Sequence, residues 1–420
     1  MTATETHRAI EAVWKIESAR LIAGLTRIVR DVGVAEELAQ DALVVALEKW
    51  PESGIPENPG AWLMGTAKHR AIDYLRRGAL IDEKHETLGR EMADREMQVP
   101  DLAAAMDDNI GDDLLRLVFI ACHPVLSADA RVALTLRLLG GLTTDEIARA
   151  YLSSEPTIAQ RIVRAKRTLT EAQVPFEIPR GADFTARLSS VLQVIYLIFN
   201  EGYSATSGED WMRPALCEEA LRLGRILAEL VPQEAEVHGL IALMEIQASR
   251  SKARTNAVGE PVLLLEQDRG KWDRLLIGRG LAALDRAEHL SRGRGPYTIQ
   301  AAIAACHARA RTRDETDWGR IVELYGELSA IEPSPVIELN RAVAMSMARG
   351  PAAGLELVEA VKDDPVLRGY HLLPSVRGDL LKKLGRFSEA RSEFERAAAM
   401  TRNDRERTLL LERARSCASE

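Results

Sequence analysis

The stretch of sequence that decides the fold is residues 142–171, LTTDEIARAYLSSEPTIAQRIVRAKRTLTE. Thr143 and Glu146 have the spacing of a capping box, which predicts that a first helix begins there. After a short turn, Ser153 or Ser154 can cap a second helix at residues 155–171. The apolar stripe of this second helix consists of Ile158, Ile162, Ala165 and Leu169. The pattern is typical of a helix–turn–helix, in which one face of the second helix packs and the other stays exposed.

The opposite side of the second helix carries Gln160, Arg164 and Arg167, with Thr157 and Arg161 at its edge, and Lys166 adds a further base to the six polar residues that could bind DNA. Arginine and glutamine side chains read base edges in the major groove, and basic side chains also bind phosphates. A plain helical hairpin would explain the apolar stripe equally well. It would not require four bases against one acid, Glu171, within the last eleven residues. These features favour a DNA-binding helix–turn–helix.

A second basic helix is expected earlier in the chain, at residues 61–77, after a helix at 34–50 and a loop at 51–60 that ends with Asn58 as a helix cap. On a helical wheel its apolar side consists of Met64, Ala67, Ala71, Tyr74 and Leu75. Its basic side consists of His69, Arg70, Asp73, Arg76 and Arg77. Trp50 and Trp62 flank the loop, where their rings could stack on unpaired bases while the arginines hold phosphates. A solvated surface with no ligand is the alternative.

The net charge of the 420 residues, −8, comes from one stretch. Residues 82–115 hold eleven acids and three bases, and the rest of the chain is balanced. This stretch is poor in aromatic residues and contains Pro100 and Gly111, a composition typical of a connection between folded units. We therefore divide the chain into a first unit at 1–80, an acidic linker at 81–115, a second unit at 116–172, a short linker at 173–181 and a third unit at 182–420.

Helical periodicity dominates all three units, and no stretch alternates apolar and polar residues long enough to predict a strand. The sequence therefore predicts an all-α protein. The four cysteines lie far apart and the histidines lack metal-ligand spacing, so we expect no disulfide framework, no metal site and no cofactor. No uncharged run approaches the roughly eighteen residues of a spanning helix, so we expect a cytoplasmic protein with no membrane segment.

The third unit carries a tetratricopeptide-like pattern near its end, where Gly385, Phe387, Ala390 and Phe394 have the expected spacing. A degenerate copy lies 35 residues earlier, with Gly350 aligned to Gly385. Paired helices that stack into a solenoid are expected, and earlier helices at 188–199, 216–230 and 235–250 would extend it. Several polar clusters exceed what a solenoid needs, and they contain Asn200, Glu201, Tyr203, Gln267, Asp268, Arg269, Asp317, Trp318 and Asn340. We interpret them as hydrogen-bond networks between helices, with a ligand pocket as the alternative.

Three motifs, in their order and spacing, resemble bacterial sigma factors of the sigma-70 family over residues 1–172. AEELAQDA (35–42) resembles the region 2 helix that binds core RNA polymerase, and AWLMGTAKHRAIDYLRR (61–77) resembles the promoter-recognition helix that follows it. PTIAQRIVRAKR (156–167) resembles the region 4 recognition helix. The absence of regions 1 and 3 resembles the extracytoplasmic-function (ECF) group, group IV. The third unit resembles the subgroup with a tetratricopeptide-like (TPR-like) C-terminal extension.

This resemblance implies a transcription initiation factor that is not an enzyme and that binds RNA polymerase core and promoter DNA. It implies contacts with the polymerase β′ clamp helices from Glu36, Glu37, Leu38, Gln40 and Asp41, and contacts with the β flap from the helices before the recognition helix. It assigns the minus-ten element to Asn58, Trp62, Lys68, His69, Arg70, Asp73, Arg76 and Arg77. It assigns the minus-thirty-five element to the six polar residues of the helix at 155–171. It also suggests a small DGGR-motif, YCII-like protein as a partner.

Two other functions remain open from the residues. A one-component regulator would bind duplex DNA through the helix–turn–helix and sense a ligand or protein through the solenoid, but it leaves the helix at 35–42 without a role. A helical-repeat scaffold is a third possibility, but it gives no role to either of the two basic helices. Within the sigma-factor interpretation, we expect the third unit to regulate activity. We also expect the acidic linker to mimic DNA and so keep the isolated protein off promoters.

Overall fold

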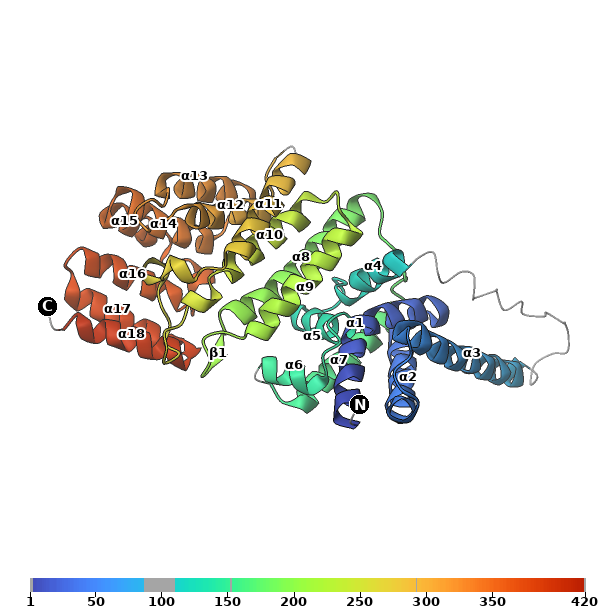
Figure 1. Ribbon diagram of the computed structural model, residues 1–420. Helices are drawn as coiled ribbons and strands as arrows, with labels where there is room; N and C mark the ends of the chain where they lie inside the picture. Colours follow the sequence, from blue (N-terminus) through green and yellow to red (C-terminus); the bar gives the residue numbers. More distant parts are fainter. Residues whose placement is uncertain (1–2, 87–109, 152, 292, 419–420) are drawn as a thin grey trace. The chain divides into compact units, whose positions relative to one another are not determined.

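The computed structural model describes residues 3–86, 110–151, 153–291 and 293–418, and these form helices almost throughout (Figure 1). Within these ranges the only sheet is a short parallel pairing between β1 (Ser207–Gly208) and β2 (Arg402–Asn403). The predicted all-α class is confirmed. The chain forms two compact units, Met1–Val194 and Ile195–Glu420. The first unit of the structure contains both the predicted first unit (1–80) and the predicted second unit (116–172), and the second unit of the structure corresponds to most of the predicted third unit (182–420).

Among its described residues the first unit contains seven helices and the start of an eighth: α1 (Ala3–Val29), α2 (Val32–Ser53), α3 (Pro59–Glu86), α4 (Ile110–Ala121), α5 (Ala128–Leu138), α6 (Thr144–Ala150), α7 (Glu155–Glu171) and α8 (Gly181–Tyr203). Helices α1, α2 and α3 pack on one another, and α1 also packs on α4. Their core is built from large apolar side chains that are almost wholly buried, among them Ile22, Leu25, Trp50 and Leu63. Burial of these side chains holds α2 and α3 in place, since each fully buried large apolar side chain contributes roughly 1.5–3 kcal/mol to folding.

The connection between α2 and α3 is shorter than predicted. Helix α2 continues through Pro51 and ends at Gly54, whose backbone φ is +82° and whose N–H donates to the Trp50 carbonyl oxygen. A proline removes only one donor from the last turn, and it is the glycine that supplies the left-handed conformation of a helix stop. Asn58 then caps α3, because its Oδ1 accepts from the Ala61 N–H at 3.0 Å, as predicted.

The helix–turn–helix forms as the sequence predicted. Thr143 and Glu146 make the capping box of α6 in both directions, and the Ser154 hydroxyl accepts from the Thr157 N–H at the start of α7. The buried residues of α7 are Ile158, Ile162, Ala165 and Leu169. They face α5 and α6, both of which pack on α7.

The second unit contains the rest of α8 followed by paired helices: α9 (Pro214–Leu230), α10 (Ala235–Ala248), α11 (Arg274–Leu290), α12 (Pro296–Arg309), α13 (Trp318–Ile331), α14 (Pro335–Arg349), α15 (Pro351–Val361), α16 (Leu372–Lys383), α17 (Phe387–Met400) and α18 (Asp404–Ser416). Four short 3-10 turns are η1 (Ser251–Ala253), η2 (Leu264–Glu266), η3 (Arg269–Lys271) and η4 (Pro365–Leu367). From α9 onward each helix packs on the next one or two along the chain, as Figure 1 shows.

Two glycines make the tight turns in the aligned repeats. Gly350 ends α14 with a φ of +95°, and Gly385 follows α16 with a φ of +74°. Five residues after each glycine stands a buried apolar side chain, Leu355 or Ala390. A Cβ on Gly354 would lie 2.6 Å from the Ser346 Cβ, so only glycine allows α15 to pack this closely on α14.

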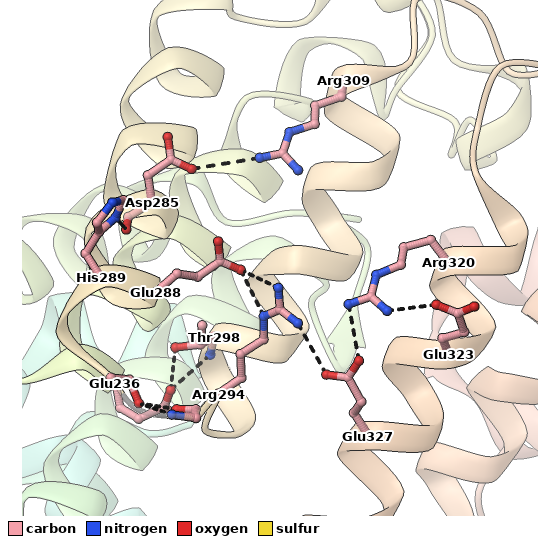
Figure 2. Close-up of polar contacts among 12 residues, drawn as sticks. Glu236, Asp285, Glu288, His289, Arg294, Thr298, Arg309, Arg320, Glu323 and Glu327 are labelled. Carbon is pink, nitrogen blue, oxygen red and sulfur yellow. Dashed lines mark hydrogen bonds and ion pairs between the residues drawn. The ribbon is translucent and has the colours of Figure 1, made fainter.

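Polar contacts also join the helices of the second unit (Figure 2). The Glu236 carboxylate on α10 accepts from the Tyr297 and Thr298 N–H groups at 2.8 and 3.1 Å and so caps α12 from a neighbouring helix. Arg294 pairs with Glu288 of α11 and with Glu327 of α13, and Figure 2 shows Arg320 on the same glutamate. These partly exposed pairs set the relative positions of the helices more than they add stability.

Helix α8 is the only helix among the described residues that is long and apolar enough to cross a bilayer. It serves as a core helix here. Val191, Leu192 and Val194 are buried, and the Ser190 hydroxyl donates to the Cys122 carbonyl oxygen at 2.7 Å. A single helix of this kind is weak grounds for a membrane location.

Candidate nucleic-acid interface

Helix α7 presents a polar face that its apolar stripe leaves exposed. Thr157, Gln160, Arg164 and Arg167 are exposed, and Arg161 is half-buried. Arg167 is paired with Glu171 at 2.6 Å, and Arg161 reaches Asp129 at 3.5 Å. Arg164 has no ion pair among the described residues. The face therefore offers donors at successive turns of one helix, with only weak surface pairs to displace.

A groove runs beside this face, between α7 and the start of α5. It has a volume of about 430 Å³ and is lined on the α7 side by Thr157, Gln160, Arg161 and Arg164. The opposite wall comes from Val125 and from Asp129, the carboxylate that pairs with Arg161. Four of the six predicted minus-thirty-five residues thus lie together along one surface.

Lys166, another predicted minus-thirty-five residue, turns the other way. Its ammonium group pairs with the Glu36 carboxylate of α2, and only a fifth of its side chain is exposed. The Arg137 guanidinium of α5 binds the same carboxylate at 2.6 Å. The Glu36 side chain is only 3% exposed, so it is a buried carboxylate held by two cations, one from α5 and one from α7.

The predicted polymerase-binding residues on α2 therefore fall into two groups. Glu37 and Asp41 are exposed and Gln40 is half-buried, whereas Glu36 and Leu38 are buried. Asp41 pairs with Arg70 of α3 at 2.5 Å, which joins a predicted polymerase contact to a predicted minus-ten contact. Both side chains of this pair are exposed, so an incoming partner can compete for either.

The basic side of α3 is exposed. His69, Asp73, Arg76 and Arg77 are exposed, while Lys68 and Arg70 are half-buried. Ala67 and Ala71 are buried as predicted, but the prediction was wrong for Tyr74 and Leu75, which are 43% and 42% exposed. None of residues 72–77 is buried, because α3 extends beyond the helices that cover its first half.

The two tryptophans beside the α2–α3 connection have different roles. Trp50 is 1% exposed, and its ring meets the Trp62 ring edge to face, with 5.2 Å between ring centroids. The proposed stacking of Trp50 on unpaired bases does not fit this burial. Trp62 remains half-buried at the start of α3 and keeps an accessible edge.

Two further contacts join the predicted first and second units, and a third joins the first unit to the predicted linker. Lys15 reaches Glu146 at 3.6 Å and the Thr170 hydroxyl donates to Asp31 at 2.9 Å, while Arg27 of α1 binds Asp113 of α4 at 3.0 Å. Asp113 is one of the eleven acids of the predicted linker, yet it is 4% exposed and lies inside α4. Burial raises the pKa of the Asp113 carboxyl group, against the effect of Arg27 and Arg116. The other linker acids mostly lie outside the described residues.

In the second unit, the structure separates the predicted polar cluster. Asp268 and Asp317 cap η3 and α13, and Glu201 binds Arg213 and the Thr206 hydroxyl. The Asn200 side chain is hydrogen-bonded to the Tyr196 side chain, and Asn340 is exposed. Gln267 donates to the Val262 carbonyl oxygen at 3.1 Å. The remaining three, Tyr203, Arg269 and Trp318, belong to a group of arginines and aromatic rings around the ends of α10 and α12.

Sequence reasoning missed several members of these sites. Arg137 binds Glu36 from 101 residues away, and Arg250, Arg254 and Trp211 complete the arginine and aromatic group. None of them lies in a periodic pattern that marks a role. The one available signal was the presence of three arginines and a tryptophan over residues 250–272.

Comparison with known proteins matches the two parts of the first unit to two families. Residues 17–80 match the family described as Sigma-70 region 2, and residues 116–169 match the family described as Sigma-70, region 4. Residues 187–288 match a family of unknown function, DUF6596.

Similar proteins agree with these matches. Uncharacterized protein R00370 of Rhizobium meliloti (strain 1021) is 45% identical over 380 residues, which cover 90% of this chain and 89% of that protein. Probable ECF RNA polymerase sigma factor SigI of Mycobacterium tuberculosis (strain ATCC 25618 / H37Rv) is 27% identical over 168 residues, 40% of this chain and 57% of that protein. ECF RNA polymerase sigma factor SigK of Mycobacterium sp. (strain KMS) is 28% identical over 158 residues, 37% of this chain and 77% of that protein. The chain therefore belongs to one family with the Rhizobium meliloti protein and, through its regions 2 and 4, to the sigma-70 family of transcription initiation factors.

Proposed function

We propose that this protein is an ECF, group IV sigma factor that binds RNA polymerase core and directs promoter-specific transcription initiation. The observation that carries the proposal is the exposed polar face of α7, in a chain whose regions 2 and 4 follow one another in the order of that group. The protein would act in the cytoplasm, where polymerase works, and it would perform no chemistry of its own.

Minus-thirty-five recognition is assigned to α7. Arg164, Gln160 and Thr157 would enter the major groove, since arginine and glutamine match the acceptors and donors of guanine and adenine. Arg161 and Arg167 would exchange their surface carboxylates for DNA phosphates. Lys166 would join them only after leaving Glu36.

Minus-ten recognition is assigned to the start and basic side of α3. Asn58 and Trp62 lie where the chain enters the helix, and an accessible indole edge can take a flipped or unpaired base. Lys68, His69, Arg70, Arg76 and Arg77 would hold phosphates along the helix, with Asp73 among them. Their exposure supports this assignment.

Polymerase binding is assigned to the exposed part of α2. Glu37, Gln40 and Asp41 would meet the β′ clamp helices, and the helices before α7 would meet the β flap. Leu38 acts by packing α2, since it is 7% exposed. Glu36 would reach polymerase only if the contacts with Arg137 and Lys166 open.

The second unit is proposed to be a TPR-like regulatory extension. Its successive helix pairs and the glycine turns at Gly350 and Gly385 support the repeat assignment. A small DGGR-motif, YCII-like protein stays a prediction as its partner.

Run-off transcription with purified core polymerase on genomic promoter fragments tests the proposal. The full chain and a chain ending at Val194 should give promoter-dependent transcripts that differ in amount, and this difference gives the sign of regulation. The cut at Val194 keeps the contact of Ser190 with Cys122 inside the shortened chain. Tight binding to core polymerase with no promoter-dependent transcript from either chain would reject the proposal.

A one-component regulator remains the second candidate, because the second unit carries an arginine group suited to a small ligand. Asp41→Lys separates the two functions, since it reverses an exposed charge on α2. A sigma factor should lose polymerase affinity while its affinity for duplex DNA is kept. Glu48→Lys is the matched control, because Glu48 is also exposed on α2 and lies outside the predicted contacts. Equal polymerase binding by both variants would favour the regulator.

A further inference from the structure

We propose that the second unit binds a small oxyanion, a phosphate or a carboxylate, at Arg250. This site does not depend on the sigma-factor assignment. Three arginines meet where α10 and α12 end: Arg250 and Arg254 follow α10, and Arg269 begins η3. None of the three has a carboxylate oxygen within 4.0 Å among the described residues.

The arginines are close enough to affect one another and are stacked on aromatic rings. The Arg254 guanidinium carbon lies 3.6 Å from the Tyr203 ring centroid and 5.5 Å from that of Trp211. The Arg250 guanidinium carbon lies 5.8 Å from the Tyr203 centroid and 5.9 Å from the Trp272 centroid. Burial lowers the pKa values of Arg254 and Arg269, and the like charge of Arg250 lowers them further.

Two of the three arginines have their N–H groups engaged by the protein. Arg269 donates to the carbonyl oxygens of His307 and Ala310 at 2.6 and 2.8 Å, and so caps the end of α12. Arg254 donates to the Tyr203 carbonyl oxygen at 2.9 Å and to the Met212 sulfur. These bonds explain why both side chains tolerate burial near a helix end.

Arg250 is different. Its Nε is buried without a hydrogen-bond partner, and no side-chain bond from it occurs within the part of the chain that the structure describes. Stacking on rings uses the face of a guanidinium group and leaves its edge of N–H donors available. A planar edge of donors in a region of uncompensated positive charge matches two oxygens of one anion.

The surroundings of Arg250 contain further buried polar atoms without partners. The indole Nε1 of Trp272 and the imidazole Nδ1 of His307 are unpaired, and both residues are less than a tenth exposed. Buried polar atoms nearly always have partners, so several without one around a single arginine indicate that a ligand supplies them.

The half-buried setting favours a compact anion over a macromolecular surface. A bound oxyanion would offset the repulsion among the three guanidinium groups and accept from the Arg250 edge and the Trp272 N–H.

Isothermal titration calorimetry on the full-length protein tests the site, with pyrophosphate and succinate as probes at constant ionic strength in KCl. We expect one equivalent of at least one probe to bind, and the preferred probe distinguishes a phosphate from a carboxylate ligand. Arg250→Gln should weaken binding at least about tenfold, because it removes a charge-assisted pair of hydrogen bonds. Arg279→Gln is the matched control, since Arg279 is exposed on α11.

Tryptophan fluorescence gives a second reading. Binding should change the emission of the wild type saturably, and Trp272→Phe should abolish most of that change. If Arg250→Gln alters the far-ultraviolet circular dichroism, Arg250→Lys replaces it, since lysine keeps the charge and loses the planar fork. Binding of neither probe to the wild type, or binding to the Arg250 variant within twofold of the wild type, overturns the proposal.

Discussion

Arginines occupy two contrasting settings in this chain. On α7 they lie at successive helical turns, Arg164 and Arg167 exposed and Arg161 half-buried, and among the described residues their ion pairs are with surface carboxylates. Beside α10 and α12 they are half-buried, stacked on Tyr203, Trp211 and Trp272, and without a carboxylate partner. The first setting suits a long polyanion that can meet a whole helix face, and the second suits a compact anion that fits among rings. The environment, more than the side chain, decides which ligand an arginine serves.

The largest effect is expected from removing two arginines of the exposed setting. Arg161→Ala with Arg164→Ala should weaken binding to a promoter duplex about 100-fold, because each removed base or phosphate contact is worth roughly 1–3 kcal/mol. The unfolding free energy should change by less than about 1 kcal/mol, since both are surface positions. Fluorescence anisotropy and urea unfolding measure the two quantities.

Arg149→Ala serves as the control for that pair. Arg149 is also exposed, on α6, and has a surface partner in Asp145. An equal loss of affinity in the control would show that general charge, and not the α7 face, binds the DNA.

The half-buried setting should respond in the opposite way. Arg269→Met leaves the His307 and Ala310 carbonyl oxygens and the Thr316 hydroxyl without their donor. We expect a loss of about 2–3 kcal/mol in unfolding free energy, because buried acceptors without partners are destabilising. DNA affinity should stay within twofold of the wild type. Arg279→Met, exposed on α11, should leave the melting temperature unchanged.

Acid should weaken the same region. Burial, with Arg250 and Arg269 nearby, lowers the pKa of His307 to about 4, against 6.5 for an unperturbed histidine. Below pH 6.5 His307 is protonated in the unfolded chain but stays neutral in the folded chain, so the free energy of unfolding falls as the pH drops from 6.5 towards 4. At pH 5 the loss is about 2 kcal/mol.

Unfolding curves at pH 7 and pH 5 measure this loss. His307→Gln should remove that part of the pH dependence, while His289→Gln, at an exposed position on α11, should keep it. Identical pH dependence in the two variants would contradict the assignment to His307.

The smallest effect is expected at Lys166 of α7, which pairs with a buried carboxylate of α2. Glu36→Gln removes the buried carboxylate that pairs with Lys166 and Arg137. Lys166 can then bind phosphate, so non-specific DNA affinity should rise a few-fold at low salt and the gain should shrink as salt increases. Glu37→Gln removes a neighbouring exposed charge as the control. A matching rise in both variants would mean that net charge alone is responsible.

The sequence predicted α7 and its buried stripe because the caps and the helical period agree at every turn. It failed at Tyr74 and Leu75, where the period continues but the covering helices end. Pro51 suggested a stop, although a proline in the last turn removes only one donor and the stop lies at Gly54. Local patterns carry information about a helix and its faces, whereas the extent of its neighbours is a tertiary property.

The sites show the same limit. Thr157, Gln160 and Arg164 lie on one surface because they belong to one helix, which a helical wheel can predict. Arg250 and His307 lie near each other because two helices end side by side, and Glu36 finds Arg137 at a separation of 101 residues. Contacts of this kind follow from packing and have no signature in a single sequence.

The glutamate cap between α10 and α12 has a consequence for how the second unit opens. Glu236 links the start of α12 to α10 through hydrogen bonds, and the arginine group lies near the ends of the same two helices. The two helices are therefore in polar contact near both of their ends. The Tyr297 and Thr298 amide protons can exchange with solvent only when the Glu236 bonds break, which makes them reporters of a joint opening of both helices. Slower deuterium uptake at these amides on addition of an anion would show that the two ends of the helix pair open as one cooperative segment.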